Sequence, residues 1–146
     1  MFSSKKFFNE EQTHAIVSAI GEAERNTSGE IRLHVEAKCK TENVLDRSVE
    51  IFYQLKMNET EAQNGVLIYI AHEDKKFAII GDKGINAVVP ATFWDGTKEV
   101  MHLHFQKGEF FEGVLFAIQE CGSHLKQYFP FGANDKNELS NEISEG

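Results

Sequence analysis

Residues 64–86, NGVLIYIAHEDKKFAIIGDKGIN, decide the fold of this chain. Within them, residues 66–71 form a nearly continuous apolar run rich in β-branched and aromatic side chains, which is typical of a central strand covered on both faces. Charged residues interrupt the run at 73–75, and residues 77–80 resume it. This pattern predicts an antiparallel hairpin. A glycine-bearing loop, residues 81–86, follows the second strand.

The chain before this hairpin predicts a parallel partner strand. Residues 30–37 alternate polar and apolar side chains, which indicates a half-covered strand. Apolar residues between 45 and 57 recur at helical spacing, so a helix connects residues 30–37 to residues 66–71. A strand, a crossover helix and a second strand form a right-handed βαβ unit, and its two strands are parallel.

Three further helices complete the predicted fold. The first begins at Asn9 and runs to about Asn26, with Glu24 in water. The next follows Trp94, and residues 109–129 form a largely buried helix that Pro130 ends. Helices on both faces of a mixed central sheet predict a three-layer α/β/α sandwich. Residues 1–131 are expected to form one domain, and the acidic residues 132–146 a flexible tail.

Composition limits the classes of partner. The chain of 146 residues has a formal net charge of −8, which argues against a nucleic-acid backbone and favours cations or basic proteins. No apolar run approaches the roughly 18 residues of a membrane span, and no signal peptide is evident, so a cytoplasmic chain is expected. Cys39 and Cys121 have no metal or redox spacing and are interpreted as free thiols.

Polar side chains outside the turns are given ordinary structural roles. His34 falls on the polar phase of its strand, so a solvated or packing histidine is favoured over a ligand. The three arginines, Arg25, Arg32 and Arg47, are expected to form exposed salt bridges.

Several motifs along most of the chain resemble the TPM domain family, which is named for a thylakoid-lumen protein of photosystem II repair, a receptor-modulating membrane protein and bacterial relatives. The matching motifs are Ser28-Gly29-Glu30-Ile31, Asn64-Gly65-Val66-Leu67-Ile68, Glu73-Asp74-Lys75-Lys76, Gly81-Asp82-Lys83-Gly84-Ile85, Phe93-Trp94, Phe105-x-Lys107-Gly108 and Phe129-Pro130. The late FWDGTKE and FQKGEFFEGV segments are typical of small stand-alone bacterial members. The resemblance implies an α/β/α sandwich and, in some relatives, divalent metal binding or acid phosphatase activity.

One end of the predicted sheet gathers the first set of candidate ligands. The first two strands begin there and the third ends there, which brings together Glu30, Asn64 and Asp82. Carboxylate and amide oxygens suit Ca²⁺ or Mg²⁺, so these three residues are the predicted metal ligands. Lys83 and Gly84 follow directly, and free N–H groups at a helix start would suit phosphate or another anion.

The opposite end provides a second candidate metal site with Glu73 and Asp74. It lies at the carboxyl ends of the two parallel strands, where open α/β sheets usually bind ligands. For both ends the alternative is a set of solvated turn residues. The sequence alone does not choose between the two ends.

These observations favour a noncatalytic module that binds a divalent cation, Ca²⁺ or Mg²⁺, and a protein partner. The alternative is a metal-dependent acid phosphatase acting on phosphate monoesters, with Asp82 as the candidate catalytic residue. That alternative depends on the family resemblance, because the sequence contains no P-loop, arginine clamp or Asp-x-Asp motif.

Overall fold

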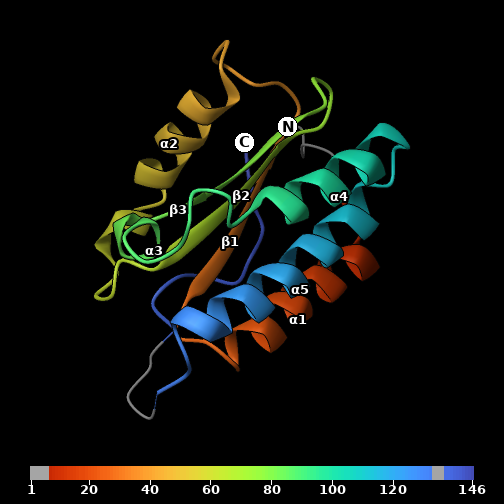
Figure 1. The fold of residues 1–146 in the computed structure, drawn as a ribbon. Helices are drawn as coiled ribbons and strands as arrows, with labels where there is room; N and C mark the ends of the chain where they lie inside the picture. The colour runs from red at the N-terminus through yellow and green to blue at the C-terminus, as the bar shows by residue number, and fades with distance from the viewer. Residues whose placement is uncertain (1–6, 133–136) are drawn as a thin grey trace.

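The computed structural model describes residues 7–132 and 137–146, and it contains one mixed sheet with helices on both faces (Figure 1). In chain order the elements are α1 (Glu10–Glu24), β1 (Glu30–Glu36), α2 (Val44–Gln54), the 3-10 helix η1 (Met57–Glu59), β2 (Gly65–Ala71), β3 (Lys76–Gly81), α3 (Lys83–Asn86), α4 (Asp95–Gln106), α5 (Phe110–Tyr128) and β4 (Ser144–Glu145).

The sheet has the strand order β3-β2-β1-β4. Strands β1 and β2 are parallel with Glu30 opposite Gly65, and β2 and β3 are antiparallel with Val66 opposite Gly81. The predicted βαβ unit and hairpin are therefore confirmed, with β2 in the interior of the sheet. The short β4 pairs in parallel with β1 through Ser144 and Glu145, and the sequence pattern did not predict it.

Two apolar clusters cover the two faces of the sheet. The larger cluster joins α1, α4 and α5 to one face, where Ile31, Leu33 and Ile68 are fully buried. The smaller one joins α2 and η1 to the other face around Leu67 and Tyr69. In Figure 1, α2 lies on one side of the sheet and α1, α4 and α5 lie on the other. The chain thus forms the predicted three-layer α/β/α sandwich.

The polar side of β1 is buried, so the prediction of a half-covered strand is wrong, and of the two roles predicted for His34 the structure shows the packing one and not the solvated one. Glu30, His34 and Glu36 are 4%, 3% and 3% exposed. Helix α2 and residues 137–146 lie over this side of the strand, with the N–H of Leu139 bonded to Glu30 and β4 paired to β1. The alternating pattern could not show that two separate segments cover the polar residues.

Residues 137–146 belong to the segment expected as an acidic tail. Leu139 is buried in the α2-side cluster, and Ile143 packs against the larger cluster. The expected flexibility of residues 132–146 and the boundary at residue 131 stay predictions. No helix within the described ranges, 7–132 and 137–146, is long and apolar enough to cross a membrane.

Candidate functional site

The end of the sheet that carries Glu30, Asn64 and Asp82 holds two separate cavities. Glu30 lies opposite Gly65 in the β1–β2 ladder, and the N–H of Asp82 donates to the carbonyl of Gly65 at 2.9 Å. Glu30 and Asp82 therefore flank Gly65 from its two sides. A Cβ at Gly65 would meet the side chains of Leu139 and Met57 at 3.5 Å, so apolar side chains lie over the strand between the two carboxylates.

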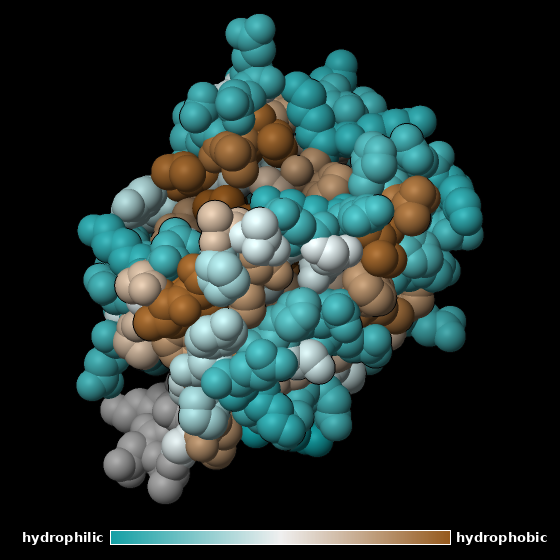
Figure 2. All heavy atoms as spheres, viewed as in Figure 1, coloured by the Kyte–Doolittle hydropathy of each residue, from teal (hydrophilic) through white to brown (hydrophobic). Residues whose placement is uncertain are grey.

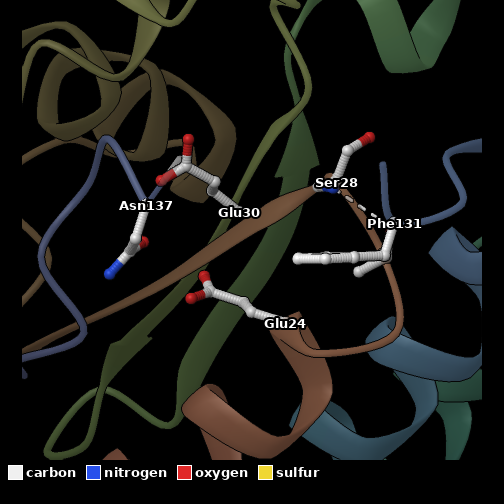
Figure 3. A pocket seen from close by; sticks show the side chains of 7 residues that line it. Glu24, Ser28, Glu30, Phe131 and Asn137 are labelled. Atoms are coloured by element: carbon white, nitrogen blue, oxygen red, sulfur yellow. Dashed lines mark hydrogen bonds between the residues drawn. The ribbon is translucent and has the colours of Figure 1, made fainter. Parts of the chain in front are cut away.

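The first cavity, the glutamate pocket, contains Glu30 and a second carboxylate from the end of α1. Its volume is about 70 Å³, and its lining residues are Glu24, Thr27, Ser28, Gly29, Glu30, Phe131 and Asn137. The side chains of Glu24, Glu30 and Asn137 extend into the same space (Figure 3). Since a water molecule occupies about 30 Å³ of liquid, the pocket has room for one ion with one or two waters.

Backbone N–H groups hold both glutamates in place. Oε2 of Glu24 accepts a hydrogen bond from the N–H of Ile31 at 2.8 Å, and Oε1 of Glu30 accepts one from the N–H of Leu139 at 2.6 Å. The first bond ties the end of α1 to β1, and the second ties residues 137–146 to the sheet. Each carboxylate is thus oriented by a neighbouring element before any ligand binds.

The electrostatics of the glutamate pocket favour a proton or a cation. Burial raises the pKa of Glu24 to about 7; the Ile31 N–H opposes this rise and the charge of Glu30 adds to it. Burial also raises the pKa of Glu30, against the N–H groups of Leu139 and Glu138. Among the described residues, no lysine or arginine lines the pocket, so none of them neutralises the two carboxylates.

Asn64 lies beside this pocket and supports its wall. Its side-chain N–H₂ donates to Oγ of Ser28 at 3.3 Å. Its backbone carbonyl accepts from the backbone N–H of Glu30 at 3.3 Å. The structure therefore brings Glu30 and Asn64 together, as the sequence predicts, and adds Glu24 to them. The third predicted ligand, Asp82, lies across Gly65 in the second cavity.

Asp82 is the N-cap of the four-residue helix α3. Its Oδ1 accepts from the N–H of Lys83 at 2.7 Å, whereas its Oδ2 is buried without a hydrogen-bond partner in the described residues. The N–H of Gly84 donates to the carbonyl of Gln63 at 2.9 Å. The two N–H groups expected to bind an anion are thus already bonded within the chain, and an anion would compete with them.

The second predicted metal site lies at the β2–β3 turn. Glu73 and Asp74 are exposed, and Oδ2 of Asp74 accepts from the N–H of Cys39 at 2.7 Å. This bond holds the turn against the segment that follows β1. Among residues 7–132 and 137–146, no three His, Cys, Asp or Glu side chains come together as a metal cluster, at this turn or elsewhere.

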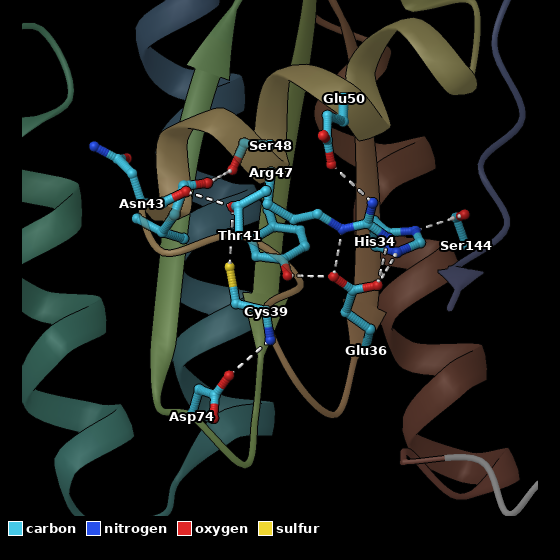
Figure 4. A network of polar contacts seen from close by, with 12 residues as sticks. His34, Glu36, Cys39, Thr41, Asn43, Arg47, Ser48, Glu50, Asp74 and Ser144 are labelled. Atoms are coloured by element: carbon cyan, nitrogen blue, oxygen red, sulfur yellow. Dashed lines mark hydrogen bonds and ion pairs between the residues drawn. The ribbon is translucent and has the colours of Figure 1, made fainter.

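Sequence reasoning missed a buried polar network on the α2 side of the sheet (Figure 4). Arg47 of α2 donates to Glu36 through Nε at 2.8 Å and Nη2 at 2.9 Å, and the hydroxyl of Tyr69 also donates to Glu36. Nε2 of His34 lies 3.5 Å from Oε1 of Glu36, and Nδ1 of His34 lies 2.9 Å from Oγ of Ser144. The prediction that Arg47 forms an exposed salt bridge is wrong, because α2 turns it onto the sheet.

The network leaves Glu36 ionised and His34 neutral. Burial alone would raise the pKa of Glu36, but hydrogen bonds from Arg47 and Tyr69 and the Arg47 charge outweigh it and lower the pKa to about 2. Burial lowers the pKa of His34, against the attraction of Glu36. Every strong acceptor in this network has a donor, so it is a structural element and not an open site.

Comparison with known proteins gives a family and two similar structures. A family model described as TPM domain matches residues 1–124. The NMR structure of BA42 protein from the psychrophilic bacterium Bizionia argentinensis is 48% identical, with a TM-score of 0.91 and full coverage of both chains. The N-terminal domain of cg2496 protein from Corynebacterium glutamicum is 10% identical, with a TM-score of 0.63 and coverage of 99% of this chain and 93% of that one, and it shares the fold. No curated protein matches. The chain belongs to the TPM domain family.

Proposed function

We propose that this TPM domain is a noncatalytic module that binds a divalent cation, Ca²⁺ or Mg²⁺, in the glutamate pocket and is recognised by a protein partner. One observation carries the cation proposal: Glu24 and Glu30 share a small cavity, and no basic side chain among residues 7–132 and 137–146 lines it. Two carboxylates in such a place repel each other unless a proton or a metal ion lies between them. A divalent cation satisfies both at once.

The oxygen donors around the pocket suit a hard cation. Each glutamate has one oxygen bonded to a backbone N–H, which leaves its other oxygen for a metal ion. The amide of Asn137 and the hydroxyl of Ser28 line the same cavity and can supply neutral oxygens. Ca²⁺ and Mg²⁺ prefer such oxygen ligands, and water would fill the remaining positions. With two carboxylates, we expect a dissociation constant of about 10⁻⁴ to 10⁻³ M.

This assignment uses part of the ligand set that the sequence suggested. Glu30 is a direct ligand, and Asn64 positions Ser28 and Glu30. Asp82 is separated from both by the apolar cover over Gly65. Glu73 and Asp74 are the fallback location, although Asp74 is already bonded to Cys39.

The phosphatase alternative receives less support from the same geometry. Phosphoryl transfer needs positive groups that converge on the phosphoryl oxygens. Arg25 is paired with exposed Glu22, and Arg47 is bonded to Glu36 and Glu50. Within residues 7–132 and 137–146, no basic residue lines the glutamate pocket, and Lys83 lies beside Asp82.

An NMR titration with CaCl₂ and with MgCl₂ at pH 8 tests the cation proposal. We expect amide shifts in residues 24–31 and 137–139 that saturate at millimolar metal. Glu24→Gln and Glu30→Gln keep an acceptor for the backbone N–H groups, and each should weaken binding at least tenfold. The matched control is Glu22→Gln, which removes an exposed carboxylate two residues away on the same helix and should leave the titration unchanged.

Three results would contradict the proposal. Shifts confined to residues 73–74 would move the site to the opposite end of the sheet, and shifts confined to residues 81–86 would move it to Asp82. Shifts that persist unchanged in Glu24→Gln and Glu30→Gln would leave only general attraction of cations to an acidic protein.

A further inference from the structure

The second cavity at this end of the sheet, the α2 groove, is an apolar hollow on the α2 side. Its volume is about 340 Å³, and it is lined by Leu45, Val49, Phe52 and Tyr53 from α2 and by Ile80, Gly81, Asp82, Lys83 and Asn86 from β3 and α3. Figure 2 shows hydrophobic surface gathered over α2 and beside the β3–α3 turn. The groove is separate from the glutamate pocket, since the two share no lining residue.

One row of apolar side chains on α2 has no cover. Leu45, Val49 and Tyr53 recur every four residues, so they form a single ridge along the helix. They are 49%, 45% and 54% exposed. The next residues around the helix, Ile51 and Phe52, are buried against the sheet. A solvent-facing helix ridge is normally polar, and an exposed apolar ridge beside a groove is typical of an interaction surface.

At the other side of the groove, Asp82 presents an incomplete polar group. The residue is 7% exposed, and its Oδ2 has no hydrogen-bond donor among residues 7–132 and 137–146. A buried carboxylate oxygen without a donor is costly, so a donor from an occupant would recover that energy. The occupant that fits therefore carries an N–H group, and a positive charge would strengthen the bond.

The charges around the groove indicate which occupant this is. Exposed Asp46 and Glu50 flank the apolar ridge on α2, with Glu50 paired to Arg47, and Lys83 lines the groove beside Asp82. Acidic residues outnumber basic ones in the whole chain, which carries a formal net charge of −8. Basic segments are therefore attracted to this face. A second copy of the chain fits less well, because a two-fold contact through this ridge would bring the same acidic side chains of both copies together.

We propose that the α2 groove binds a segment of a partner protein that presents apolar side chains next to a lysine or arginine. The apolar side chains pack on Leu45, Val49 and Tyr53, and the basic group donates to Asp82. This inference gives a location to the partner recognition proposed above, and so rests on that part of the proposed function. It does not depend on cation binding in the glutamate pocket.

The test uses three synthetic peptides of about 16 residues and ¹⁵N-labelled protein. The first peptide is an amphipathic helix former with leucines at i, i+3, i+4 and i+7 and lysines beside them. The second has glutamate in place of each lysine, and the third has serine in place of each leucine. We expect the first peptide alone to shift the amides of residues 45–53 and 80–86. Those amides should not move when CaCl₂ is added without peptide.

Substitutions in the protein then separate the two kinds of contact. Leu45→Ser together with Val49→Ser should abolish the shifts. Asp82→Asn keeps the capping oxygen for Lys83 but removes the charge, and it should weaken binding about tenfold or more, as expected for loss of a charged hydrogen bond. The control is Leu103→Ser, which changes a comparably exposed leucine, 52% exposed, on α4 and should leave binding unchanged.

Four results would overturn the inference. The first is no shift in α2 at millimolar concentration of the lysine peptide, and the second is equal binding of the glutamate peptide. The third is binding that survives the double serine variant, which would place the peptide on another surface. The fourth is a shift of the same amides with protein concentration alone, which would make a second copy the occupant. The cation titration is read from different amides, so either proposal can fail without the other.

Discussion

Glu30 and Glu36 lie on the same strand and the same face, with almost equal burial, and yet their surroundings give them opposite properties. Glu36 meets the guanidinium of Arg47 and the hydroxyl of Tyr69, and its pKa falls to about 2. Burial raises the pKa of Glu30, and the charge of Glu138 adds to the rise, with no cation from the described residues beside it to oppose the shift as Arg47 does at Glu36. Glu30 in turn adds to the raised pKa of Glu24. Burial alone therefore does not decide whether a carboxylate is structural or available for a ligand. The charges and donors that face it decide.

The two regions differ in how complete their polar contacts are. Around Glu36, two donors from Arg47 and one from Tyr69 occupy both carboxylate oxygens. In the glutamate pocket, backbone N–H groups are the donors to Glu24 and Glu30, and the two carboxylates share one cavity. The first region stabilises the fold without a ligand, and the second is complete only with a bound cation or proton. Four predictions test this difference between the two regions.

The largest effect is expected from removing the cation that neutralises Glu36. Arg47→Met leaves a buried carboxylate unpaired, so the free energy of unfolding should fall by about 3–5 kcal/mol. Urea denaturation measures this loss. The double variant Glu36→Gln and Arg47→Met should recover most of it, because no charge is then left unpaired. A loss below about 1 kcal/mol in the single variant would mean that Glu36 is stabilised by water instead.

The two regions should respond to pH in opposite directions. The pKa of Glu24 in the folded protein, about 7, lies above the ordinary glutamate value of 4.5. Its contribution to stability is therefore complete below pH 4.5 and lost as pH rises to 7. Glu36 has a lowered pKa, so its contribution is present above pH 4.5 and lost as pH falls to about 2.

Denaturation curves between pH 4 and 8 measure the contribution of Glu24 to the free energy of unfolding. Because Glu24 is half-buried, we expect a loss of about 1–2 kcal/mol across this range, which should be absent in Glu24→Gln. Glu22→Gln, an exposed neighbour on the same helix, is the control and should keep the pH dependence. Identical curves for the wild type and Glu24→Gln would show that water already stabilises the Glu24 charge.

A smaller effect is expected from the cation itself. At tenfold its dissociation constant, Ca²⁺ or Mg²⁺ should stabilise the folded protein by about 1.4 kcal/mol at pH 8. At pH 5 the protonated form of Glu24 competes with the metal ion, so the stabilisation should shrink. Thermal unfolding with and without metal at both pH values measures the difference. Equal stabilisation at both pH values would indicate that the metal ion binds outside the glutamate pocket, for example at the turn with Glu73 and Asp74.

Much of the fold could be predicted because its signals are local. The apolar run of β2, the hairpin charges and the helix spacing each reside within a few consecutive residues. The site was harder to predict, because residues far apart in the sequence create it. Glu30 is buried by Leu139, and Asp82 is kept from it by β2, which lies between their strands. A strand pattern contains neither fact.

The sequence contained a signal for the burial of Glu24, but none for the contact between Glu36 and Arg47. Glu24 follows Ile16 and Ile20 at intervals of four, so helical spacing already places it on the buried side of α1. Interpreting it as a solvated end residue ignored that spacing. No comparable signal pairs Glu36 with Arg47, because the rotation of α2 over the sheet sets their contact.

The smallest effect expected is in a phosphatase assay, where the difference between the two regions gives the reason. Arg47 lies in the network around Glu36, and no basic side chain in the described part of the chain lines the glutamate pocket. A phosphate monoester would bring negative charge to two carboxylates without a cationic group to stabilise its transition state. The purified protein should therefore show little or no turnover with saturating Mg²⁺ or Ca²⁺ at acidic and neutral pH.

Several phosphate monoesters should be assayed, with Asp82→Asn as the control for a contaminating phosphatase. Residual activity that is equal in the wild type and in Asp82→Asn comes from the contaminant, and the prediction stands. Metal-stimulated turnover that disappears in Asp82→Asn would make the chain an enzyme with Asp82 in its active site. It would also mean that the unpartnered Oδ2 of Asp82 serves a metal ion or a phosphoryl group, and that the lysine beside it, Lys83, provides enough positive charge for the reaction.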